Sequence, residues 1–123
     1  MKLKALEILN IYGALEALAD KELDLNTSCT IARNLKELLT VKETFEKKRD
    51  AITMEYAEKD EEGNFVQVEN GIKIKDVAAF NEKITKLLNT VIEVTISHIS
   101  KSALDGVKVS PKDIFPLIDF LDE

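Results

Sequence analysis

The chain has 123 residues, of which 45% are hydrophobic and 33% are charged, and its formal net charge is −6. This length is typical of one domain, 1–123, which can bury most of the surface that its unfolded form exposes. The acidic balance argues against nucleic acid as a partner, because Lys and Arg side chains supply the affinity for phosphates.

Two features indicate a reducing compartment without membrane contact. Cys29 is the one cysteine, which excludes an internal disulfide. The apolar stretch 5–18 is interrupted by Glu7, Asn10 and Glu16, so it does not match a signal peptide, and no apolar run has the length needed to cross a bilayer. We therefore expect a cytoplasmic protein that does not enter a membrane.

The first predicted element is a helix over about 4–21, in which leucine, isoleucine and alanine recur at helical spacing. Gly13 lies in its interior, where glycine costs about 1 kcal/mol relative to alanine. This glycine either marks the close approach of another helix or is simply tolerated. Leu23 and Leu25 then alternate with polar residues, which predicts an extended connection with both leucines turned toward the core.

A long helix is predicted from about Ser28 to Ala57, with Thr27 or Ser28 as its N-cap. It would be ~45 Å long, which exceeds the usual length in globular proteins. Its apolar side chains form one stripe, made by Ile31, Leu35, Leu38, Phe45, Ile52 and Tyr56. Lys42 and Arg49 interrupt this stripe where a coiled-coil seam would be apolar, so we expect an antiparallel helix pair or an oligomer seam.

A β-hairpin with its tip at Asn70-Gly71 follows the acidic turn 58–64. A two-residue loop at the tip would mix apolar and polar residues on both faces. A three-residue loop from Glu69, with Gly71 in the left-handed conformation, would instead collect the β-branched residues on one face. The predicted cross-strand pairs are then Val68 with Ile72 and Val66 with Ile74. Because an isolated ribbon is only marginally stable, this face must cover a helix, a third strand or a second copy.

The third predicted helix begins at the N-cap Asp76 and ends near Asn89. Its inner face would carry Val77, Phe80, Ile84, Leu87 and Leu88. A half-buried strand should come next, since β-branched and polar residues alternate over 92–97, and His98 would follow on the apolar face.

The C-terminal segment is predicted to contain a helical turn over 100–105 closed by Gly106, a short strand over 107–109, and a last helix. That helix starts with a Ser110 cap and Pro111 in its first turn, although Pro116 removes an early hydrogen bond. Its inner face would carry Ile114, Leu117, Ile118 and Leu121.

Three stretches resemble a family of small proteins encoded by phages and prophages of Gram-positive bacteria. They are 29–36 (CTIARNLK) at the start of the long helix, the acidic turn with its glycine-tipped hairpin, and 104–113 (LDGVKVSPKD). The resemblance implies a phage or prophage origin. It brings no catalytic residues to this chain, because the shared motifs are caps and turns.

Few residues occur in patterns that are typical of a catalytic or metal-binding site. Cys29 lies near a helix N-terminus, where the helix dipole can activate a thiol, and His98 lies at the end of the predicted strand. Asp60, Glu62 and Asn64 alternate like the start of a calcium loop, but the spacing of the downstream ligands and the position of the glycine are wrong, so a turn is the better interpretation. We therefore expect no cofactor and no metal.

These patterns predict a mainly helical α+β fold. A long antiparallel helical pair joined by a β-hairpin would be supported by an N-terminal helix and a C-terminal strand–turn–helix segment. The leading functional hypothesis is a non-enzymatic, phage-encoded protein–protein interaction or assembly protein that forms homo-oligomers. The candidate partner-binding residues are Val66, Val68, Ile72, Ile74, Phe45, Ile52 and Tyr56. The alternatives are an acidic inhibitor of a host defence protein or nuclease, a small-molecule sponge, and a small enzyme using Cys29 or His98.

Overall fold

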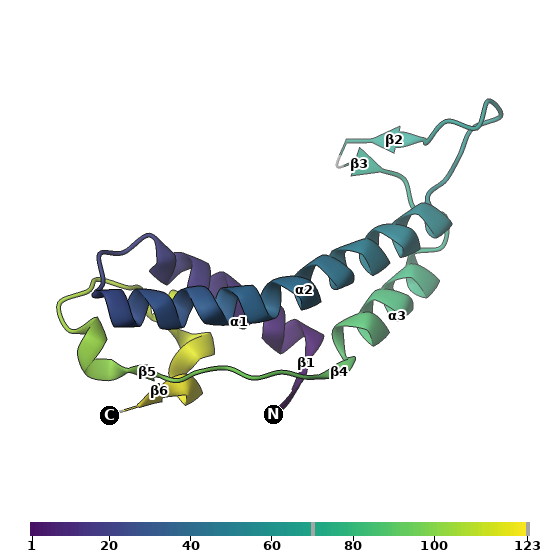
Figure 1. The fold of residues 1–123 in the computed structure, drawn as a ribbon. Helices are drawn as coiled ribbons and strands as arrows, with labels where there is room; N and C mark the ends of the chain where they lie inside the picture. The colour runs from purple at the N-terminus through teal and green to yellow at the C-terminus, as the bar shows by residue number, and fades with distance from the viewer. Residues whose placement is uncertain (70, 123) are drawn as a thin grey trace.

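The computed structural model describes residues 1–69 and 71–122 of the chain. A body that holds both termini continues into a helical stalk, and the stalk ends in a projecting hairpin (Figure 1). The predicted mainly helical α+β fold is confirmed. Its main helices are α1 (Ala5–Ala19), α2 (Leu25–Tyr56) and α3 (Val77–Leu88).

Short strands pair in three places in the described part of the chain. In the antiparallel pairs, β1 (Lys2–Lys4) lies beside β4 (Val91–Glu93), and β2 (Gln67–Val68) lies beside β3 (Gly71–Ile72). The parallel pair joins β5 (Ile99–Ser100) to β6 (Leu121–Asp122). The strands therefore connect helices and termini instead of building a central sheet.

The start of α2 differs from the prediction. Asp24 is the N-cap: its carboxylate accepts from the Thr27 backbone N–H at 2.8 Å and from the Thr27 hydroxyl at 3.0 Å. These bonds lower the pKa of Asp24, the backbone bond most strongly. The assignment of the cap to Thr27 or Ser28 is wrong, because a carboxylate satisfies both Thr27 donors together. Leu25 is consequently the exposed first residue of α2 and does not face the core. Leu23, in contrast, packs against the core as predicted.

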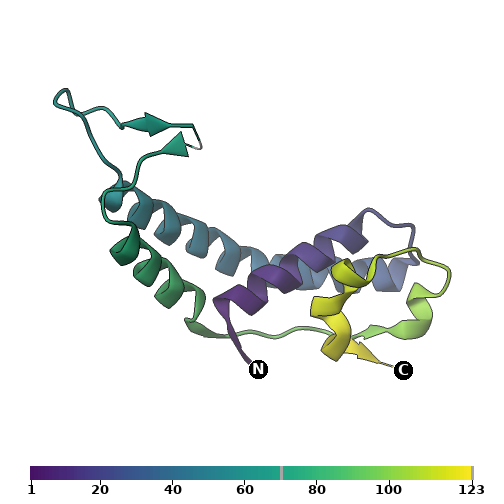
Figure 2. The same cartoon turned by 180° about the vertical axis from the view of Figure 1, so that it is seen from behind.

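The excess length of α2 is covered within the same chain. Its N-terminal half packs against α1 and its C-terminal half against α3, as the view from behind shows (Figure 2). Fully buried side chains of α1, such as Leu15 and Leu18, meet Ile31 and Leu38 of α2 in one core. An added Cβ at Gly13 would meet no atom within 4 Å, so this glycine is tolerated and marks no close helix approach. No helix among the described residues has the length and apolarity needed to cross a membrane.

The third helix agrees with its prediction apart from its first residue. The Asp76 carboxylate accepts from the Ala79 N–H at 3.1 Å, which confirms the N-cap. Four of the five predicted inner-face residues are half-buried, but Val77 is exposed. The reason is that α2 ends at Tyr56, whose ring meets Phe80, so no helical partner extends as far as Val77.

The extended segment after α3 shows the predicted alternation up to Ile96. Val94 and Ile96 are buried, and then the buried positions change parity, so that Ile99 is buried and His98 is exposed. The expectation that His98 continues the apolar face is therefore wrong. The change in the parity of the buried positions occurs at Ser97. The Ser97 N–H donates to the Asn34 side-chain oxygen at 2.8 Å, and the Asn34 side-chain nitrogen donates to the Ser97 C=O at 2.9 Å.

The C-terminal segment confirms the turn and the cap but not the strand over 107–109. A 3-10 turn, η1 (Lys101–Leu104), precedes Gly106, which has a φ of 79°. In α4 (Pro111–Ile114), the Ser110 hydroxyl accepts from the Asp113 N–H at 3.3 Å. The residues 107–109 form no strand, and the parallel pairing of β5 with β6 holds this part of the fold together.

The last helix changes its period at Pro116. It continues as a 3-10 helix, η2 (Phe115–Phe120), because proline has no N–H for the α-helical bond. Steps of three then turn Ile114, Leu117 and Phe120 toward the core. Ile118 is exposed, so its predicted inner position is wrong, whereas Leu121 still packs against the core.

Candidate interaction surfaces

The hairpin and the extended residues that flank it form an arm, defined here as residues 57–75, which projects beyond α2 and α3 (Figure 1). Gln67 pairs with Ile72, and Val68 pairs with Gly71. This register differs by one residue from the predicted pairing of Val68 with Ile72, and it matches neither of the loops considered from the sequence. The loop residue Asn70 lies outside the described residues. Gly71 has the expected positive φ, at 124°.

The backbone of Glu58 explains the register. In a regular hairpin the Val66 N–H and the Lys73 C=O would bind one another. Here the Val66 N–H donates to the Glu58 C=O and the Glu58 N–H donates to the Lys73 C=O, both at 2.8 Å. The Lys73 N–H donates to the Val66 C=O, also at 2.8 Å. The residues that leave α2 therefore form a third segment of the arm and tie it to the stalk.

The acidic turn lies at the outer end of the arm. One carboxylate oxygen of Asp60 accepts from the backbone N–H groups of Glu62 and Asn64, at 2.9 and 3.0 Å. Asp60 thus stabilises a turn, in agreement with the interpretation from the sequence. Among the described residues, no group of three or more His, Cys, Asp or Glu side chains is placed to hold a metal ion.

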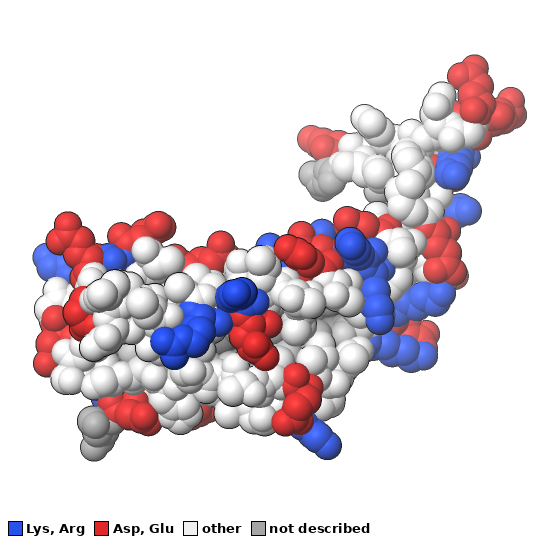
Figure 3. Space-filling view, viewed as in Figure 1, with Lys and Arg blue, Asp and Glu red and all other residues white. Residues whose placement is uncertain are grey.

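The register divides the apolar residues of the arm between two faces. Because directly paired residues share a face, Ile72 lies on one face and Val68 on the other. The predicted single face of four β-branched residues is therefore wrong. Val68 is 49% exposed and Ile72 is 37% exposed, whereas Val66 and Ile74 are half-buried. The acidic residues of the arm gather mainly at its outer turn (Figure 3).

The three candidate residues on the stalk contact other parts of the same chain. Phe45 is 8% exposed, and Ile52 and Tyr56 are half-buried. The Tyr56 ring meets Phe80 edge to face, with 6.2 Å between ring centroids, and the Lys83 ammonium lies 5.3 Å from the centre of the Tyr56 ring. The stalk interior is thus formed by α2 and α3, and these three residues are covered within the chain, whereas Val68 and Ile72 of the arm are exposed.

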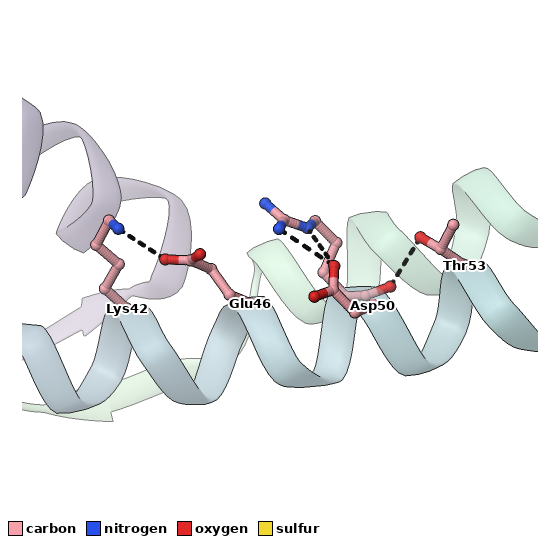
Figure 4. Close-up of polar contacts among 5 residues, drawn as sticks. Lys42, Glu46, Asp50 and Thr53 are labelled. Atoms are coloured by element: carbon pink, nitrogen blue, oxygen red, sulfur yellow. Dashed lines mark hydrogen bonds and ion pairs between the residues drawn. The ribbon is translucent and has the colours of Figure 1, made fainter. Parts of the chain in front are cut away.

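The charged residues that interrupt the α2 stripe have partners on α2 itself (Figure 4). Lys42 donates to Glu46 at 2.7 Å, and this bond raises the pKa of Lys42. Arg49 lies 3.2 Å from Asp50. Because these groups are partly exposed, each pair contributes little to stability. Their pairing nevertheless means that neither cation requires a second copy of the chain as its partner.

An apolar patch at the base of the molecule was missed from the sequence. Phe115 is 77% exposed and lies beside the exposed Ile118 on η2. Both line a hollow of about 360 Å³ against α1, with Glu7 and Asp119 also among the lining residues. A 3.6-residue period places Ile118 inside, and Pro116 is the sequence signal that this period ends.

His98 and Cys29 lie apart from these surfaces. The Nδ1 atom of His98 lies 2.8 Å from an Asp122 carboxylate oxygen, and its ring meets Phe120 edge to face. A carboxylate in this position can fix the orientation of an imidazole. Cys29 is exposed, and in the described part of the chain it has no hydrogen bond to His98 or to another base. The structure therefore does not join the two residues into one site.

The geometry defines a helical stalk protein with an anchored, solvent-exposed arm. Comparisons with protein-family models, with curated proteins and with solved structures found no match. Function is therefore inferred from the surfaces of this chain.

Proposed function

We propose that this chain is a non-enzymatic, phage-encoded protein–protein interaction or assembly protein that acts as a homo-oligomer in the cytoplasm of the host cell. The observation that carries the proposal is the arm, which is fixed to the stalk by backbone hydrogen bonds and exposes Val68 and Ile72 on opposite faces. The phage origin rests on the resemblance of three sequence stretches, and the reducing compartment on the single Cys29.

The arm offers main-chain groups as well as apolar side chains. Since the pair Val66 and Lys73 is hydrogen-bonded, the next pair, Gln67 and Ile72, is of the non-hydrogen-bonded kind. The N–H and C=O groups of such a pair point to the outer edges of the ribbon. Unpaired edges of this kind accept a further strand, from another copy or from another protein. This supports binding by strand addition, with Val68 and Ile72 packing beside the added strand.

The test combines oligomeric state with capture of a partner from host lysate. Light scattering on the wild-type chain is expected to give a mass above that of the monomer. The Val68→Ser/Ile72→Ser double variant is expected to lose both the oligomer and the captured partner. Leu25→Ser is the matched control, because Leu25 is also exposed and apolar but lies at the opposite end of α2. A strictly monomeric wild type whose double variant retains the same partner would contradict the proposal.

A second candidate is an acidic inhibitor that occupies a basic surface of a host defence protein or nuclease. The acidic turn at residues 60–64 favours it, because carboxylates gather at the outermost point of the arm (Figure 3). Electrostatic binding of this kind weakens as salt rises. Affinity for the captured partner is therefore expected to fall between low and high ionic strength, and a salt-independent complex would exclude this candidate.

A further inference from the structure

A groove lies where α2 passes from its contact with α1 to its contact with α3. We call it the α2 groove. Its volume is about 290 Å³, close to the lower end of the range for small-molecule sites. Its apolar lining includes Val41 and Phe45 of α2, Leu87 of α3 and Ile92 of β4. α2 and the α3–β4 segment, which are far apart in sequence, therefore build one apolar floor.

A polar row borders this floor. Thr40, Thr44 and Lys48 follow one another at four-residue steps on α2, so they stand on one side of the helix. Eight residues of helix span ~12 Å along the axis. Each of the first two polar residues is followed directly by an apolar lining residue, Val41 after Thr40 and Phe45 after Thr44. The groove is therefore an elongated amphipathic site with a cation at one end.

Lys48 supplies an uncompensated positive charge. It is the one charged residue that lines the groove, and its ammonium group has no ion pair or hydrogen bond within the part of the chain that the structure describes. Two other cations of this part of α2 are paired, Lys42 with Glu46 and Arg49 with Asp50 (Figure 4), and the adjacent Lys47 does not line the groove. A ligand with an apolar body and one negative charge would complement both the floor and this ammonium group.

We propose that the α2 groove binds a small amphiphilic anion, with its apolar chain over Phe45 and its anionic head at Lys48. The proposal is independent of the arm, because none of the residues that line the groove belongs to residues 57–75. The groove length favours an extended chain over a bulky polycyclic ligand. The charge favours the anion over the corresponding neutral amphiphile.

Titration with decanoate, followed by calorimetry and by amide chemical shifts, tests the proposal. Decanamide is the uncharged control ligand. Decanoate is expected to bind the wild-type chain, and Lys48→Gln is expected to weaken it about two- to fivefold, as for a partly exposed ion pair. Lys47→Gln is the matched variant, because Lys47 is the adjacent lysine and does not line the groove. The binding of decanamide should be unchanged in both variants.

A second variant separates groove binding from a general surface effect. Thr44→Phe places a large ring in the groove from an exposed helical position, so the fold should persist in circular dichroism. This variant is expected to bind neither decanoate nor decanamide. The proposal is overturned if the wild type does not bind decanoate, if Lys47→Gln weakens binding as much as Lys48→Gln does, or if Thr44→Phe still binds. It is also overturned if Thr44→Phe dissociates an oligomer, because a second copy would then fill the groove.

Discussion

The Asn34 side chain replaces a neighbouring strand for the segment that follows α3. It is 2% exposed. Its amide nitrogen donates to the Ser97 C=O at 2.9 Å, and its amide oxygen accepts from the Ser97 N–H at 2.8 Å. Asn34→Ala removes both bonds and leaves the two backbone groups of Ser97 facing a methyl group, between the buried Ile96 and Ile99.

The expected loss follows from the number of groups that remain unpaired. A buried donor or acceptor left without a partner costs about 1–3 kcal/mol. Two such groups, with some relaxation toward water, give an expected destabilisation of about 2–4 kcal/mol. This is a large part of the stability of a whole domain, which is typically about 5–15 kcal/mol. Asn34→Asp keeps the acceptor but places a carboxylate against the Ser97 C=O, so it should destabilise the fold at least as much.

Urea unfolding measures the difference. With an m value of about 2 kcal/mol per molar urea, the middle of the typical range, the midpoint of Asn34→Ala should fall by about 1–2 M with m unchanged. Asn10→Ala is the control for an exposed asparagine, and Ser97→Ala keeps both backbone groups of Ser97 paired. Neither control should shift the midpoint appreciably. If Asn34→Ala unfolds at the same urea concentration as Asn10→Ala, the two hydrogen bonds between Asn34 and Ser97 do not stabilise the fold, and the prediction is refuted.

Three further predictions concern the helices and the arm. Gly13→Ala should raise the free energy of unfolding by about 0.5–1 kcal/mol in thermal melts, because the helix gains propensity and the new Cβ meets no atom within 4 Å. Glu58→Pro should speed amide exchange over 66–73 without affecting α1, because proline cannot donate to the Lys73 C=O; Glu58→Ala keeps that donor and should not. Asp24→Ala should be less stable than the wild type at pH 7, because it lacks the cap. The lowered pKa of Asp24 means that its stabilisation is present above the ordinary value of 3.8 and is lost as the pH falls through the lower folded-state value, so urea midpoints of the two proteins should converge in acid.

The long helices could be predicted because their signals are local. The apolar stripe of α2 identifies its length and its inner face, and the Asp76 and Ser110 caps fall where predicted. The start of α2 could not be decided from residue types, since Asp24, Thr27 and Ser28 are all good N-caps. Only the geometry shows one carboxylate accepting from both donors of Thr27.

The register of the hairpin depends on a group outside the hairpin. The pattern of β-branched residues predicts a single apolar face, and this would hold for a ribbon that pairs only with itself. Instead, the Glu58 C=O accepts from the Val66 N–H, and the Glu58 N–H donates to the Lys73 C=O. Because these are backbone groups, the identity of residue 58 does not reveal the two bonds. Asn34 could have been identified from the sequence, because it lies between Ile31 and Leu38 on the buried stripe of α2. A buried amide side chain at such a position needs a hydrogen-bond partner from another element.

The arm is positioned before any partner arrives, and this makes its variants informative. Lys83 of α3 donates to Glu55 of α2 at 2.9 Å, a bond that raises the pKa of Lys83 and joins the two stalk helices next to the arm. The Lys75 N–H donates to the Tyr56 C=O at 2.8 Å, so the last residue of the arm is fixed to the stalk. A surface held in place loses little conformational entropy on binding. Val68 and Ile72 lie outside the buried core. Their replacement by serine should therefore leave the unfolding midpoint close to that of the wild type, so that a loss of oligomer or partner in the double variant reports on the binding surface and not on the fold.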